Sequence, residues 1–170
     1  GKTLNIDNPK LNCRLEGFNQ FSPKRIILDR NLQIDLKSYI AKSIKNKNTI
    51  IFHNSNDKSK IKLLKKRGTI LIKQSTDKYK NLDLKKILKD LYKMEIRNLL
   101  VEGGDILTKN FIQKKLFNEF YMFRSSKNLS KNKKHVNFTS FSILNTKYNK
   151  HKINSKLATD KLTIYKNWNV

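Results

Sequence analysis

The chain has 170 residues and an apolar content of 37%, enough for one folded domain with a core, although its mean hydropathy is −0.68. Its apolar runs are much shorter than the roughly 18 residues that a membrane helix needs. A single cysteine, Cys13, excludes an internal disulfide and a multi-cysteine zinc site. We therefore expect a protein of the reducing cytoplasm without a membrane partner.

The net charge of +25 is typical of proteins that bind nucleic acid or anionic membranes. Only six of the 38 basic residues are arginine, however, and arginine is preferred for two-point contacts with phosphates and bases. The most basic stretch, 125–135, also contains no aromatic side chain that could stack on bases. A nucleic-acid surface stays an alternative, but the composition favours a solvated lysine surface and small anionic ligands.

The N-terminal stretch predicts a loop over residues 1–14, because Asp7-Asn8-Pro9 is a turn signal. Thr3 and Arg14 flank this turn. An arginine just after a rigid turn is suited to hold a phosphate through two hydrogen bonds. From spacing alone, an ordinary turn with an exposed arginine is the simpler interpretation.

Four short apolar runs of buried type predict strands at 24–29, 48–54, 68–74 and 97–103. Their nearly continuous apolar character is typical of parallel strands that are covered on both faces. Between the third and fourth runs, four apolar residues fall on one helical face, and Asn81 or Asp83 precedes them as a cap: Leu84, Ile87, Leu88 and Leu91. This spacing predicts a helix.

After Gly104, the i,i+4 pairs Leu107–Phe111 and Ile112–Leu116 predict a second helix. A strand is expected at 118–123, and the polar segment 125–150 is expected to be a flexible loop. Residues 151–168 predict an antiparallel hairpin that turns around Ala158 to Lys161.

Together, these elements predict an α/β domain with a mostly parallel central sheet, helices on both faces and a C-terminal antiparallel hairpin.

Gly103 and Gly104 lie between the predicted strand at 97–103 and the helix that follows. At the carboxyl edge of a parallel sheet, bare backbone lets a phosphate approach closely, and the N–H groups of a helix start attract an anion. The diphosphate of a dinucleotide would suit this position. A plain tight turn is the alternative.

Three motifs, in this order and spacing, resemble the C-terminal reductase domain of bacterial riboflavin-biosynthesis proteins. The first motif is the N-terminal loop, with Gly1, Thr3, Asp7, Asn8, Pro9, Leu11 and Arg14. The second is the strand "RIILD" at 25–29, and the third is "VEGG" at 101–104 with the helix and strand that follow. The final "ATDKLTIYK" resembles the family's closing strand, with Ala158 in place of the usual glycine.

This resemblance implies a dihydrofolate-reductase-like fold, with residues 1–170 as a single reductase domain. It also implies NADPH-dependent reduction of 5-amino-6-(5-phosphoribosylamino)uracil, a phosphorylated pyrimidine, to the ribitylamino product. Another reductase of the same fold is the alternative within the enzyme class, but a dihydrofolate reductase has no need for an arginine on a substrate phosphate.

The resemblance also implies roles for individual residues. It assigns substrate binding to Leu11, Arg14 and Glu102, with Arg14 on the ribose 5-phosphate. Asp7 is the candidate for orienting the proton source, a role that a water could equally fill. Cofactor binding is assigned to Thr3, Asp7, Arg30, Gly103, Gly104, Asp105, Ile106, Leu107, Thr108, Lys109 and Asn110.

Two of these assignments have simpler alternatives. Arg30 could pair with the 2′-phosphate of NADPH or simply face solvent. Glu102 could hold ribose hydroxyls or cap the N–H groups of the following helix.

The sequence departs from the family pattern at two places. The family domain begins with a strand, a turn and a helix before the first motif, so we expect the chain to be a fragment of the reductase domain. After the strand at 118–123, the stretch "RSSKNLSKNKKH" replaces the family's usual loop. The resemblance further implies a homodimer and a zinc deaminase, fused upstream or separate, whose H-x-E and P-C-x-x-C motifs this sequence does not contain.

Overall fold

The computed structural model describes residues 2–126, 140–153 and 160–167. The chain divides into two compact units, Gly1–Leu99 and Leu100–Val170. In the described ranges, no helix is both long and apolar enough to cross a membrane.

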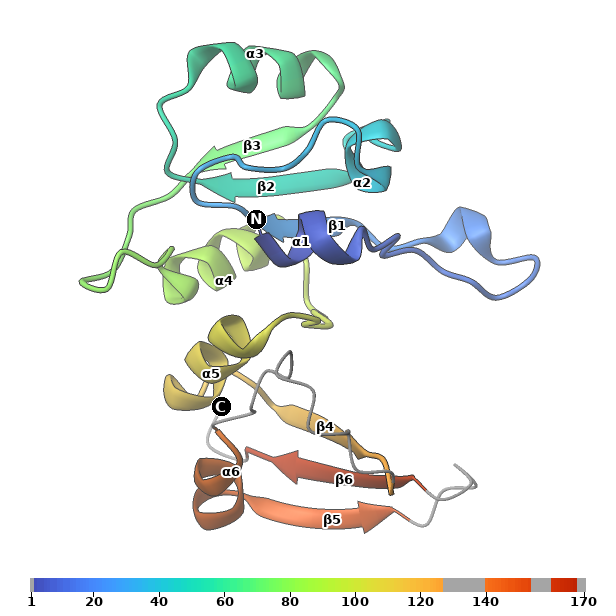
Figure 1. Ribbon diagram of the computed structural model, residues 1–170, viewed down its shortest axis with the longest axis vertical. Helices are drawn as coiled ribbons and strands as arrows, with labels where there is room; N and C mark the ends of the chain where they lie inside the picture. Colours follow the sequence, from blue (N-terminus) through green and yellow to red (C-terminus); the bar gives the residue numbers. More distant parts are fainter. Residues whose placement is uncertain (1, 127–139, 154–159, 168–170) are drawn as a thin grey trace. The chain divides into compact units, whose positions relative to one another are not determined.

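The first unit is built around a parallel sheet (Figure 1). Its elements are α1 (Lys2–Asp7), the 3-10 helix η1 (Asn19–Phe21), β1 (Arg25–Leu28), α2 (Tyr39–Lys42), β2 (Thr49–His53), α3 (Lys58–Lys66), β3 (Ile70–Lys73) and α4 (Leu84–Lys93).

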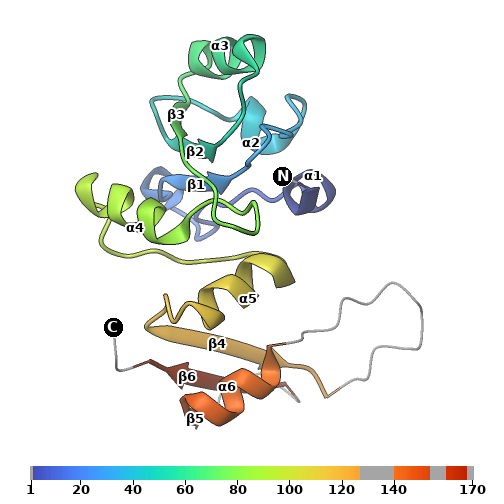
Figure 2. The same cartoon turned by 90° about the vertical axis from the view of Figure 1, so that its left-hand side faces the viewer.

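The sheet has the order β1-β2-β3, and the register aligns Ile27 with Ile51 and Ile51 with Leu71. All five residues of the central strand β2 are buried. One face packs into a core cluster with Ile40 of α2 and Leu64 of α3. In both views, the strands lie between α3 and α4 (Figures 1 and 2). The first three predicted strands and their parallel pairing are therefore confirmed.

Helix α4 forms as its apolar spacing predicts. Asp83 is its N-cap, and the carboxylate accepts hydrogen bonds from the backbone N–H groups of the two residues after Leu84. Leu84, Ile87 and Leu91 are buried, so the predicted apolar face is the face that packs.

The predicted strand at 97–103 is wrong. These residues adopt no regular structure, and no strand of the described ranges pairs with them. Leu100 is 83% exposed, and Leu99 and Val101 are more than one-third exposed. An apolar run becomes a strand only where a neighbouring strand accepts its backbone hydrogen bonds, and this run has no such neighbour.

The second unit contains a three-stranded antiparallel sheet of its own, with the order β4-β6-β5. Its elements are α5 (Asp105–Gln113), β4 (Glu119–Arg124), α6 (Phe141–Lys147), β5 (Asn149–Ile153) and β6 (Lys161–Lys166). The predicted helix, strand and antiparallel C-terminal hairpin are confirmed. Of the turn predicted around residues 158–161, residues 158 and 159 fall outside the described residues, and Lys161 is the first residue of β6. The strands thus form two sheets rather than the single, mostly parallel sheet that the sequence predicts.

The predicted loop over 125–150 is wrong in its second half, because residues 141–147 form α6 and β5 begins at residue 149. Leu144 is fully buried and packs with Ile112 of α5 and Tyr165 of β6. This apolar contact stabilises a short helix that the polar composition of the segment does not predict. Residues 127–139 lie outside the described ranges.

Candidate active site

The N-terminal motif begins with a helix rather than the predicted loop. Residues 2–7 form α1, and the turn follows at Asn8, whose φ is 40°. Leu4 packs against the core cluster of the parallel sheet. Asn5 donates to the carbonyl of Gln33 at 2.8 Å, and its side-chain oxygen accepts from the backbone N–H of Asp35 at 3.0 Å. These contacts explain why this segment is helical despite the turn signal at its end.

Of the motif's predicted site residues, Thr3 lies within α1 and Asp7 is its last residue, with an exposed side chain. Leu11 has a φ of 48° and packs, partly buried, against the core cluster. A positive φ is uncommon for leucine, and such strain is often found at functional positions. Arg14 is exposed and makes no hydrogen bond or ion pair with another residue of the described ranges.

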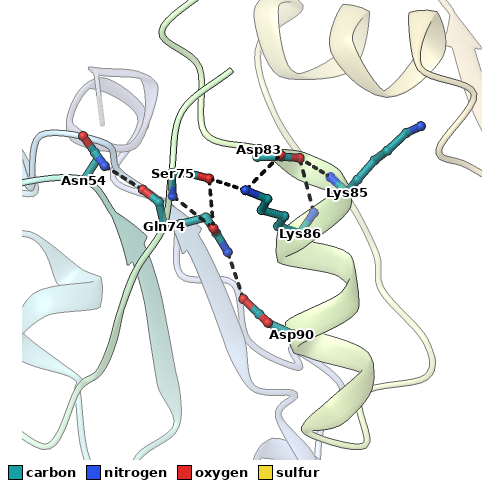
Figure 3. Close-up of polar contacts among 7 residues, drawn as sticks. All are labelled: Asn54, Gln74, Ser75, Asp83, Lys85, Lys86 and Asp90. Carbon is teal, nitrogen blue, oxygen red and sulfur yellow. Dashed lines mark hydrogen bonds and ion pairs between the residues drawn. The ribbon is translucent and has the colours of Figure 1, made fainter. Parts of the chain in front are cut away.

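The carboxyl ends of the three parallel strands form one connected edge. The backbone N–H of Asn54, just after β2, donates to the carbonyl of Arg30, just after β1, at 2.8 Å. The side-chain amide of Asn54 donates to the carbonyl of Gln74, just after β3, at 2.7 Å (Figure 3). Ligands of open α/β sheets bind at this kind of edge.

Arg30 is held at this edge by its own side chain. Its Nε donates to the side-chain oxygen of Asn31 at 3.2 Å, and its Nη1 donates to the carbonyl of Lys80. The Nη2 donors make no hydrogen bond to another described residue, so the guanidinium is oriented and still has donors for an anion. It does not simply extend into solvent.

A polar network connects the same edge to α4 (Figure 3). The side-chain amide of Gln74 donates to a carboxylate oxygen of Asp90 at 2.9 Å. The ammonium group of Lys86 donates to the hydroxyl of Ser75 at 2.9 Å. Both bonds join a residue that follows β3 to a residue of α4. Sequence reasoning missed Asn54, Gln74 and Ser75, although their positions at the carboxyl ends of the predicted strands 48–54 and 68–74 could have indicated them.

His53, the last residue of β2, is only 4% exposed. Its Nδ1 is buried and has no hydrogen-bond partner in the described part of the chain. Burial is the largest influence on the pKa of His53 and lowers it. The Ser55 backbone opposes this effect, Lys73 and Lys65 lower the pKa, Asp29 raises it, and the net shift is downward. The imidazole is therefore neutral at pH 7.

The second group of predicted residues surrounds the start of α5. Gly104 is the N-cap, with φ −72° and ψ 174°, and no side chain caps the helix. Among the described residues, no side chain accepts a hydrogen bond from the first N–H groups of the helix, which leaves them available to an anion. Glu102 is exposed and forms no hydrogen bond with these N–H groups, so it is not their cap.

Gly103 and Gly104 are glycines for different reasons. A Cβ on Gly103 would lie 2.7 Å from Cδ2 and 3.3 Å from Cβ of Leu107, so a side chain at this position would force the Leu107 side chain to shift. The dihedral angles of Gly104 are ordinary extended values that any residue can adopt. The contact with Leu107 accounts for the glycine at position 103, whereas the backbone angles of Gly104 do not require a glycine.

Within α5, the remaining predicted residues differ in solvent exposure and in their hydrogen bonds. Ile106 is 72% exposed, and its carbonyl accepts from the side-chain amide of Asn110 at 2.8 Å. The hydroxyl of Thr108 contacts the carbonyl of Gly103 at 3.5 Å, and Lys109 is exposed. Asp105 has a buried Oδ1 without a hydrogen-bond partner in the described ranges.

The predicted site residues divide between the two units. Thr3, Asp7, Leu11, Arg14 and Arg30 belong to the first unit, whereas Glu102 and residues 103–110 belong to the second. No hydrogen bond or ion pair joins Asp7, Arg14 and Arg30 to one another within the described part of the first unit.

Comparison with known proteins identifies the family. Residues 1–155 match the model of the RibD C-terminal domain. The chain belongs to this family. Neither a lysine-rich nucleic-acid-binding domain nor another reductase of the same fold is favoured by this match.

Curated relatives agree with the family match. The riboflavin biosynthesis protein RibD of Actinobacillus pleuropneumoniae is 30% identical over 125 residues, which cover 74% of this chain and 32% of that protein. RibD of Aquifex aeolicus is 28% identical over 126 residues, covering 74% of this chain and 33% of the relative. The chain therefore spans about a third of the length of the curated relatives it matches.

Solved structures show the same fold. Acinetobacter baumannii RibD matches with a TM-score of 0.71 and 20% identity, over 97% of this chain and 44% of that one. A pyrimidine reductase-like protein from Corynebacterium diphtheriae matches with a TM-score of 0.65 and 14% identity, over 97% of this chain and 72% of that one. The predicted α/β fold class is confirmed.

We predict that Gly103→Ala destabilises the second unit by about 1 kcal/mol, because the added Cβ displaces the Leu107 side chain. Thermal unfolding measures the effect as a midpoint lowered by a few degrees. Gly104→Ala is the matched control, since its backbone angles suit alanine, and its midpoint should change by less than half as much. Equal losses in both variants would contradict the packing role of Gly103.

We also predict that stability falls on acidification because of His53. Its folded-state pKa is lowered, so the unfolded chain binds the proton more readily, and the stabilisation present above pH 6.5 is lost as the pH falls towards the folded-state value. Unfolding midpoints between pH 8 and 5 should fall more steeply for the wild type than for His53→Gln. His151→Gln, exposed on β5, should keep the wild-type slope. An unchanged slope in His53→Gln would contradict this assignment.

Proposed function

We propose that the chain is the reductase domain that converts 5-amino-6-(5-phosphoribosylamino)uracil to its ribitylamino product with NADPH, in the cytoplasm. The match to the RibD C-terminal domain over residues 1–155 is the observation that carries the proposal. The proposal assigns both units to one reductase domain. It also includes two partners that the family resemblance implies, a second copy of the chain and a zinc deaminase, fused or separate.

The N-terminal end of α5 is proposed to hold the diphosphate of the cofactor. Gly104 offers no side chain at the N-cap, and the unpaired N–H groups of the first turn are donors for phosphate oxygens. The residues from Gly103 to Asn110 form this binding segment, with Thr3 and Asp7 as further contacts. When bound, the nicotinamide supplies the hydride, and the protein supplies orientation and electrostatics.

Arg30 is proposed to select NADPH over NADH. Its guanidinium is fixed at the carboxyl edge of the parallel sheet by Asn31 and Lys80, and the Nη2 donors stay available for a 2′-phosphate. A charge-assisted bond of this kind is stronger than a neutral one, so one arginine suffices to discriminate between the two cofactors.

The substrate is proposed to bind along the segment after α1. Arg14 has no partner among the described residues and is free to take the ribose 5-phosphate, while Leu11 and Glu102 contact the rest of the substrate. The exposed carboxylate of Asp7 is proposed to orient the proton source for the product.

Gly104→Val should abolish NADPH binding, because a branched side chain fills the space that the diphosphate needs. Its φ of −72° and ψ of 174° suit valine, so thermal unfolding should stay close to that of the wild type. Calorimetric titration with NADPH measures the loss, and Arg14→Ala is the control that should retain cofactor affinity. Cofactor affinity like that of the wild type in the valine variant would reject this binding segment.

Arg30→Ala should weaken NADPH binding by roughly tenfold and leave NADH binding unchanged, because only NADPH carries the 2′-phosphate. The two dissociation constants, measured by fluorescence titration, test this prediction. Arg97→Ala removes the same charge from an arginine that lies over the ring of Tyr92, and should alter neither constant. A similar loss for both cofactors, or in both variants, would indicate a general charge effect instead.

A further inference from the structure

The segment that follows Arg14 forms a loop whose ends are tied together. The backbone N–H of Cys13 donates to the hydroxyl of Ser22 at 3.2 Å, and that hydroxyl donates to the carbonyl of Asn19 at 2.7 Å. Residues 14–21 therefore form one projecting loop before β1 begins, as Figure 1 shows.

A tight turn inside this loop limits the distance between the backbones of Arg14 and Phe18. The N–H of Phe18 donates to the carbonyl of Leu15 at 3.1 Å, and Gly17 supplies the φ of 77° that such a turn needs at its third position. A turn of this kind holds the Cα atoms of Leu15 and Phe18 within about 7 Å. The Cα atoms of Arg14 and Phe18 are then at most about 11 Å apart, once one step of about 3.8 Å is added.

The loop exposes more apolar surface than its own packing explains. Phe18 is 54% exposed and Phe21 is 69% exposed, and their rings contact each other with centroids 5.9 Å apart. This pair of rings, Phe18 and Phe21, is the aromatic pair. Each ring braces the other, and large parts of both stay accessible to a ligand.

We infer that the aromatic pair stacks on the pyrimidine ring of the phosphorylated substrate while Arg14 holds its phosphate. This inference rests on the proposed function and extends it with two positioning residues. Arg14 has no partner among the described residues and lies in the same loop as the two exposed rings, a combination that matches a ligand with both an anion and a flat heterocycle. The charges of the loop also argue against an anionic membrane, because Arg14 and Glu16 cancel within residues 14–21.

Two ligands separate the roles of the arginine and the rings. Ribose 5-phosphate carries the phosphate alone, whereas uridine 5′-phosphate also carries a pyrimidine. We expect the wild-type chain to bind uridine 5′-phosphate about tenfold more tightly than ribose 5-phosphate in calorimetric titrations. Phe18→Leu combined with Phe21→Leu should remove this tenfold difference, while Arg14→Gln should weaken both ligands.

Matched variants separate stacking from a general loss of apolar surface. Leu15→Ser removes an equally exposed apolar side chain, 67% exposed, and should leave both affinities unchanged. Phe18→Trp keeps a ring and should retain the preference for uridine 5′-phosphate. Thermal unfolding and NADPH affinity of the leucine variant should match the wild type, because both rings are exposed.

The possible failures differ from one another. If ribose 5-phosphate does not bind the wild type, or binds independently of Arg14, the proposed substrate site itself is rejected. If it binds through Arg14 but the leucine variant keeps the preference for uridine 5′-phosphate, only the stacking inference is overturned. Loss of self-association or of vesicle binding in the leucine variant, with unchanged ligand affinities, would assign the aromatic pair to a second copy or to a membrane and overturn the inference as well.

Discussion

Burial of β2 on both faces is the constraint on which the first unit depends. No residue of this strand faces solvent, so elements must cover the sheet on each side. Its neighbours run parallel to it, and parallel strands require crossover connections such as the one through α3. As a consequence, all three strands end at one edge, and the residues that follow them meet there. The hydrogen bonds that join Arg30, Asn54 and Gln74 are thus a result of how the core is built.

The two adjacent glycines at the start of α5 differ in the reason for the missing side chain, which is a packing contact at Gly103 and the proposed cofactor binding at Gly104. Gly103 lets the side chain of Leu107 lie close to the backbone, in the space that a Cβ would occupy. Gly104 occupies an N-cap position where serine, threonine, aspartate or asparagine would normally satisfy the first N–H groups. A glycine at that position gives up this stabilisation and leaves the donors available. Exposed donors of this kind bind water or an anion, as the proposed function assigns to them.

Much of the fold could be predicted where apolar side chains alone determine an element. The first three strands and α4 follow directly from runs and periodicity of isoleucine and leucine. Helix α3 could not be recognised in this way, because five of its nine residues are lysine and only Leu64 is fully buried. The strand prediction for 97–103 failed for the opposite reason. The apolar composition of this segment indicates a tendency to be buried, but composition cannot reveal whether a partner strand lies beside it.

The sequence predicted which residues belong to the candidate site, but not the contacts that surround each of them. The motifs indicated Arg14 and Arg30, yet only the structure shows that Arg30 is oriented by backbone and side-chain oxygens while Arg14 has no partner among the described residues. The turn signal at Asp7 to Pro9 led to a loop prediction where helix α1 forms. The contacts that stabilise this helix and the turn after it come from the distant residues 33–39. Such contacts between distant segments leave no local pattern in a sequence.

The large positive charge and the two arginines have separate roles in this interpretation. With 38 basic and 13 acidic residues, most cations have no carboxylate to pair with, and their field attracts anionic ligands over the whole surface. Lysine is flexible and strongly hydrated, so this field raises the rate of encounter without selecting a ligand. Selection needs a planar guanidinium, and the proposed function assigns this role to Arg30, which is held at the sheet edge, and to Arg14, which has no partner among the described residues. The excess of lysine is therefore compatible with a small-molecule enzyme, because attraction and recognition depend on different residues.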